Sequence, residues 1–118
     1  MKEILQRLQQ IPGVVGSMVM TEDGMVVCSA LGPGLESESL AALSSGTRLS
    51  LQRAAVQSGD GKPHEIVLEG TEGNLVLLEI GEATLIVVTH AGLELDSGML
   101  EIRSVARKLR GILEIQTS

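Results

Sequence analysis

Residues 14–30 read VVGSMVMTEDGMVVCSA, and this stretch decides the fold. Two apolar runs rich in Val and Met flank the pair Asp23-Gly24. An Asp-Gly pair favours a type I′ turn, because both of its central residues need a positive φ. The stretch therefore predicts a tight β-hairpin.

Helical patterns lie on both sides of this hairpin. Residues 1–10 carry Ile4, Leu5 and Leu8 on one stripe, which predicts a short amphipathic helix that ends at Pro12-Gly13. Residues 37–57 contain no Pro and predict a second, longer helix. Two apolar stripes run along it: Leu40, Leu43, Thr47, Leu51 and Ala54 form one, and Ala42, Gly46, Leu49 and Val56, interrupted by Arg53, form the other. We expect one stripe to face the sheet of this chain and the other to face a partner.

The second half of the chain predicts three more strands and a closing helix. HEIVLE (64–69) and NLVLLEI (74–80) flank the turn GTEG and form a second hairpin. Residues 83–89 are apolar at almost every position, which is typical of an interior strand buried on both faces. Residues 95–113 predict the last helix, and its expected inward residues are Leu100, Val105, Leu109, Ile112 and Leu113. Short links between the strands indicate an antiparallel sheet within one domain over residues 1–118, with helices on both faces.

Composition excludes several classes of partner. The formal net charge is −6 and the chain has no Phe, Tyr or Trp, so we expect no nucleic-acid binding. No apolar run reaches about 18 residues and no leader is evident, so we expect no membrane contact and a cytoplasmic protein. The one cysteine, Cys28, is interpreted as a small buried hydrophobe rather than a reactive thiol.

Each nucleotide-binding or metal-binding motif that the sequence partly matches lacks at least one required residue. Ser37 stands where a dinucleotide fingerprint needs its third glycine, and Pro63 stands where a phosphate loop needs Ser or Thr. His64-Glu65 begins like a zincin motif, but Leu68 occupies the place of the second His. We therefore predict no enzyme activity, no cofactor and no metal. A basic cluster on the last helix favours a solvated face, with a patch for an acidic partner as the alternative; it comprises Arg103, Arg107, Lys108 and Arg110.

The ordered pieces resemble the Roadblock family, the dynein light chain Roadblock type, which includes bacterial and archaeal MglB-like members. Three segments carry the resemblance: LQQIPGVVGSMVMTEDGMVVCS (8–29), ESLAALSSGTRLSLQRA (38–54) and EIVLEGTEGNLVLLEIGEATLIVV (65–88). The resemblance implies a three-layer, profilin-like α/β/α sandwich with a five-stranded antiparallel sheet. Its element order would be helix-strand-strand-helix-strand-strand-strand-helix, with the second helix on one face and the terminal helices on the other.

The same resemblance implies a function. Family members pair through the second helix and the third strand, and many bacterial and archaeal members are encoded beside Ras-like GTPases or bind them. We therefore expect a non-catalytic homodimer that regulates or scaffolds a small Ras-like GTPase. The expected dimer interface comprises Ala42, Gly46, Leu49, Arg53, Val56, Ile66 and Leu68. The expected polar contacts to the GTPase are Arg48, Arg53 and Gln57.

Two alternatives stay open at this point. The chain could be a structural adaptor in a larger assembly, such as a dynein-like or a polarity and motility complex, without direct contact to a GTPase. A small-molecule sensor rests only on analogy between sandwich folds. An arginine finger, which would accelerate hydrolysis by the partner, would have to come from Arg48 or Arg53, for which pairing roles are favoured.

Overall fold

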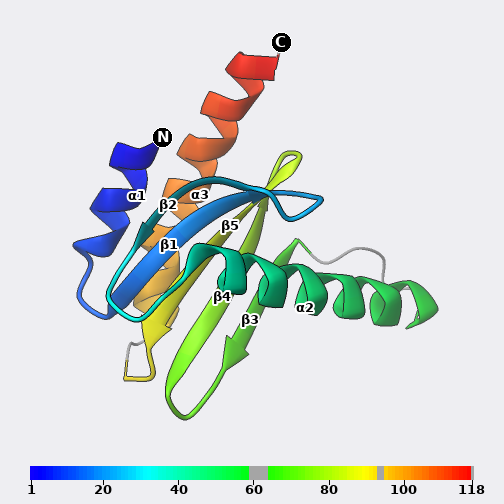
Figure 1. Cartoon of the computed structure of the whole chain (residues 1–118), viewed down its shortest axis with the longest axis horizontal. Coiled ribbons are helices and arrows are strands. Elements are labelled where there is room, and N and C mark those ends of the chain that lie inside the picture. Colours follow the sequence, from blue (N-terminus) through cyan, green and yellow to red (C-terminus); the bar gives the residue numbers. More distant parts are fainter. Residues whose placement is uncertain (59–63, 93–94, 118) are drawn as a thin grey trace.

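The computed structural model describes residues 1–58, 64–92 and 95–117 (Figure 1). The helices and strands follow the predicted order: α1 (Lys2–Gln9), β1 (Val14–Thr21), β2 (Val26–Leu31), α2 (Ser37–Ser58), β3 (Glu65–Glu69), β4 (Gly73–Ile80), β5 (Ala83–His90) and α3 (Leu95–Thr117).

The five strands form one antiparallel sheet in the order β2-β1-β5-β4-β3. The prediction of an interior strand at residues 83–89 is confirmed, because β5 pairs with β1 on one side and with β4 on the other. The edges of the sheet are therefore β2 and β3, which lie far apart in the sequence.

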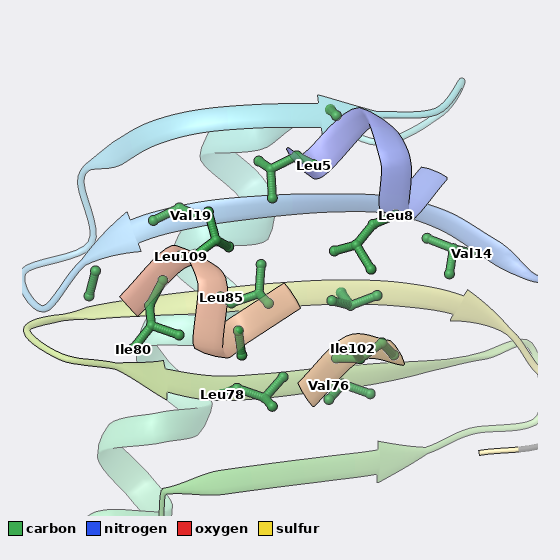
Figure 2. Packing of buried hydrophobic residues seen from close by; sticks show 14 of the residues in the cluster. Leu5, Leu8, Val14, Val19, Val76, Leu78, Ile80, Leu85, Ile102 and Leu109 are labelled. Carbon is green, nitrogen blue, oxygen red and sulfur yellow. The ribbon is translucent and has the colours of Figure 1, made fainter. Parts of the chain in front are cut away.

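Helices cover both faces of the sheet, as the three-layer prediction requires. α2 crosses one face, whereas α1 and α3 lie on the other (Figure 1). Alternate strand residues point to opposite faces, so the core is divided into two clusters. The larger one joins α1 and α3 to the sheet through residues such as Leu5, Leu85 and Leu109 (Figure 2). The smaller one, beneath α2, comprises Met18, Met20, Leu40, Ala41, Ile66, Leu77 and Ile86.

The first hairpin forms as predicted, but the predicted turn type is wrong. Among the described residues only glycines have a positive φ, Gly24 at 88° being one of them, so Asp23 does not adopt the left-handed conformation of a type I′ turn. Thr21 N donates to Met25 O at 2.8 Å, and Gly24 N donates to Thr21 O at 3.0 Å. These bonds define a three-residue connection that ends on a left-handed glycine, a common alternative hairpin turn.

Two predictions for the last helix are wrong. α3 continues to Thr117 rather than ending near residue 113, and Leu100 is 67% exposed rather than inward. The buried residues of this helix include Met99, Ile102, Ala106 and Leu109. Their spacing of three, four and three residues follows one face, and Leu100 lies about 100° around the helix from Met99.

Candidate functional site

Fewer residues of α2 pack on the sheet than the predicted apolar stripe contains, and some of those that do are polar. Leu40 and Ala41 are buried, but so is Ser44. Leu43 is 61% exposed, and Leu51 and Ala54 are exposed as well, which corrects the predicted inward stripe. The C-terminal half of the helix runs out beyond β3 (Figure 1).

Arg48 anchors α2 to the sheet. Its Nη1 donates a hydrogen bond of 2.7 Å to Thr84 Oγ1 on β5, and its Nη2 donates one of 3.0 Å to the carbonyl oxygen of Glu22 in the first hairpin. One turn earlier, Ser45 Oγ lies 3.6 Å from Met20 Sδ. The sequence assigned Arg48 to a partner contact, whereas its guanidinium already bonds to two groups of its own chain.

The outer face of α2 and the neighbouring part of β3 form a mainly apolar surface, which we call the α2–β3 surface and on which Arg53 is the exposed cation among the described residues of α2. It contains a shallow groove of about 580 Å³. The groove is lined by Ala42, Leu43, Gly46, Thr47, Ser50, Leu51 and Leu68. Leu49 and Leu68, which the sequence assigned to an interface, are 48% and 41% exposed.

Gly46 lies in the middle of this surface. A Cβ atom built at Gly46 would meet nothing within 4 Å, so packing within the chain does not require glycine there. Small residues on an exposed helix face allow another backbone to approach closely, and their use here fits a contact with a second chain.

The residues predicted for the dimer interface differ in where they lie in the structure. Ala42, Gly46 and Leu68 come together in the groove. Ile66 is buried in the cluster beneath α2, so its side chain already packs within the chain. The side chain of Val56 lies outside the described residues.

Among the polar predictions, Arg53 and Gln57 are exposed on α2. Leu43 and Leu51 are outer residues that their hydrophobicity alone had assigned to the sheet. Ser44, Ser45 and Arg48 lie on the side of α2 that faces the sheet. Their helical spacing is the feature of the sequence that could have indicated a polar inward face.

The basic cluster on α3 is partly neutralised by the strands below it. Arg103 donates two hydrogen bonds to Glu65, of 3.0 Å to Oε2 and 2.7 Å to Oε1. These bonds lower the pKa of the Glu65 carboxyl and raise the pKa of the Arg103 guanidinium. Arg110 donates to the carbonyl oxygen of Glu79 at 2.7 Å. This arrangement favours an exposed structural face over a patch for an acidic partner.

Groups that could perform chemistry are sparse. Within the described ranges no three His, Cys, Asp or Glu side chains gather as metal ligands would. Cys28 is half-buried, and burial raises the pKa of its thiol, which lowers the fraction of reactive thiolate. In the part of the chain that the structure describes, no helix is both long enough and apolar enough to span a bilayer.

The fold and its exposed helix now permit comparison with known proteins. The family model of the Roadblock/LC7 domain matches residues 1–90. The chain belongs to the Roadblock/LC7 family. A relative from Methanocaldococcus jannaschii, "Uncharacterized protein MJ1340", is 28% identical over 109 residues, which is 92% of this chain and 96% of the relative.

Solved structures of this family have the same fold. A Roadblock/LC7 domain from Streptomyces avermitilis superposes with a TM-score of 0.85 at 22% identity, covering 97% of this chain and 98% of the other. Myxococcus xanthus MglB gives 0.86 at 22% identity, with 96% and 94% coverage. A structure described as "MglB with tetrameric arrangement" gives 0.83 at 23% identity, with 95% and 86% coverage. At these identities the likeness concerns the fold.

Proposed function

We propose that this chain is a single Roadblock domain that acts as a non-catalytic, homodimeric platform for a small Ras-like GTPase. The observation that carries the proposal is the α2–β3 surface, an exposed apolar face whose groove has no charged residue in its described lining. Contiguous exposed apolar patches on a folded domain mark sites of protein contact. The family is one of regulatory and adaptor proteins rather than enzymes.

A second copy of the chain fits this surface well. A two-fold axis brings identical patches together, so the patch must be complementary to itself. The described lining of the groove meets this condition, because none of its side chains is charged. β3 is also an edge strand, and pairing with its twin would extend the sheet across the axis and cover its open backbone groups. The charge of Glu65 at one end of the strand is already compensated by Arg103 of the same chain. The MglB structure with a tetrameric arrangement supports self-association within the family.

The GTPase is expected to contact the rim of this dimer. Two α2 helices held side by side would form a rigid surface, and rigid surfaces lose little entropy on binding. Arg53 and Gln57 are exposed near the C-terminal end of α2 and can donate hydrogen bonds to a partner. Arg48 acts differently in this proposal: it fixes the orientation of α2 from below.

The test begins with capture from native lysate on the immobilised wild-type protein, with and without a GTP analogue, followed by identification of the GTPase. Calorimetry then compares its GDP-bound and analogue-bound forms. Because a regulator of nucleotide state must bind the two forms differently, we expect affinities that differ by about tenfold. Equal affinities would reduce the role to a passive scaffold, and a capture without any GTPase would favour the adaptor function.

A matched control connects the GTPase test to the dimer. The variant Leu49→Arg should lose both self-association and GTPase binding if the platform is the dimer. Leu100→Arg places the same charge at an exposed leucine of α3, on the opposite face of the sheet from α2 (Figure 1), and should retain both. GTPase binding by a monomeric Leu49→Arg protein would contradict the proposed platform.

A further inference from the structure

The opposite edge of the sheet has a distinct surface that the α2–β3 dimer leaves open. Its edge strand is β2, and the residues that lead into it are unusually exposed for apolar side chains. Met25 is 65% exposed and Val26 is 37% exposed. Residues 25–31 read MVVCSAL and contain neither a charged residue nor a proline.

This edge has one bulge but no charged residue or proline to protect it against strand pairing. Natural edge strands are blunted by charges, prolines, short length or bulges, because their open N–H and C=O groups otherwise recruit another strand. β3 carries a glutamate at each end, Glu65 and Glu69. β2 has one bulge, where Met20 pairs with Val26 and Val19 pairs with Cys28, so that Val27 is the extra residue. Beyond that bulge the strand keeps a regular register through Leu31.

A groove of about 480 Å³ lies at the hairpin end of β2, between the turn that leads into this strand and the first half of α2. Its apolar lining includes Met25, Val26 and Ala41, and its carboxylates are Asp23 and Glu38. None of the described residues that line it is a lysine, arginine or histidine. The groove therefore combines an apolar floor with negative charge.

We propose that the edge of β2 binds an extended segment of another polypeptide as a sixth strand. One face of that strand would place an apolar side chain over Met25 and Val26 and a lysine or arginine beside Asp23 and Glu38. Backbone hydrogen bonds supply affinity in this mode of recognition, and alternate side chains supply specificity.

Charge decides against a second copy of this chain as the occupant. A two-fold pairing of β2 with its twin would bring both pairs of carboxylates toward the same interface, and like charges brought together oppose association. A basic segment is attracted by the same groups. The inference is independent of the proposed GTPase platform, because it uses the other edge of the sheet.

The experiment is an NMR titration of the 15N-labelled full chain with two capped peptides of alternating Val and Thr. One peptide carries a central Lys and its twin carries Glu at that position. We expect shifts confined to residues 25–31 and 37–45, and binding of the Lys peptide tighter by about fivefold, as a weak, partly exposed ion pair permits. Shifts at residues 65–69, equal affinities for the two peptides, or no binding at about 1 mM peptide would overturn the proposal.

Matched variants locate the charge effect. Glu38→Gln should reduce the preference for Lys, because only Asp23 then supplies negative charge in the groove, whereas Glu72→Gln, the same change in the turn between β3 and β4, should retain the full preference. The Leu49→Arg protein, which the platform proposal makes monomeric, should bind the Lys peptide as the wild type does. If the GTPase platform proposal is wrong, peptide binding at β2 should be unchanged. If no peptide binds at β2, the platform proposal is unaffected.

Discussion

The two edges of the sheet differ in the position of their charge. At the β3 edge the charges sit on the strand, while the groove against α2 is neutral. At the β2 edge the strand is neutral, while the groove against α2 holds Asp23 and Glu38. A neutral groove suits a second copy of the same chain, whereas a charged one suits a partner of opposite charge. One helix can thus present two surfaces with different specificities.

Both surfaces depend on the same support. α2 lines each groove, and Ala42 contributes to both. The helix is held by a small apolar cluster and by the hydrogen bonds of Arg48 to Thr84 and Glu22. A substitution within one groove should therefore affect one binding surface, whereas a substitution that weakens the packing of α2 on the sheet should affect both.

Of all the variants, Leu49→Arg should have the largest effect, and this effect is on the dissociation constant of the dimer. A buried, unpaired cation in an apolar interface should weaken dimerisation by about 2 kcal/mol or more, which is about 30-fold in the dissociation constant. Light scattering over a range of concentrations measures it, with Leu100→Arg as the charge-matched control. A Leu49→Arg protein that dimerises as tightly as the wild type would remove α2 from the interface.

Arg48→Met should destabilise the monomer itself. The change keeps an apolar stem but removes the donors to the Glu22 carbonyl and to the buried Thr84 hydroxyl, at a cost of about 1–3 kcal/mol. Urea unfolding in the Leu49→Arg background measures this cost without a contribution from dimerisation. Arg53→Met, at an exposed position of the same helix, should cost much less, and equal midpoints for the two variants would contradict the anchoring role.

Gly46→Ala should raise the free energy of unfolding of the monomer but lower the affinity of the dimer. Replacing a glycine within a helix stabilises the monomer by about 0.5–1 kcal/mol, because the side chain has open space within its own chain. If the two helices approach closely at Gly46, the added methyl groups should weaken dimerisation. Urea unfolding in the Leu49→Arg background and light scattering in the wild-type background measure the two effects. An alanine variant that dimerises more tightly would show that the helices do not meet there.

The smallest effect is expected for Glu65→Gln at the β3 edge. Arg103 lowers the pKa of Glu65 in the folded protein, so the stability from this pair is present above the unfolded pKa of about 4.3 and is lost as the pH falls through the folded pKa. The unfolding midpoints of wild type and variant should therefore differ at neutral pH and converge in acid. Glu69→Gln on the same strand is the control, and a difference that persists in acid would contradict the assignment.

The hairpins, the interior position of β5 and the three layers could be predicted from the sequence, because alternation and apolar runs report burial directly. The surface of α2 could not be. The hydrophobic pattern of the sequence predicts Leu43 and Leu51 as core residues, yet the inward face contains Ser44 and Arg48 instead. Hydrophobicity does not reveal that Arg48 finds acceptors in Thr84 and Glu22, since these residues meet only in the folded chain.

The most direct test of the account is hydrogen–deuterium exchange of the wild-type protein at two concentrations, one dilute and one on the order of tens of micromolar. Both edge strands are read in the same experiment. We predict that amides of residues 65–69 and of α2 residues 42–53 gain protection at the higher concentration, while amides of residues 26–31 do not. Concentration-dependent protection at residues 26–31 with none at residues 65–69 would contradict the assignment of the two edges. Protection that is independent of concentration, from a protein that light scattering shows to be monomeric, would contradict the dimer itself.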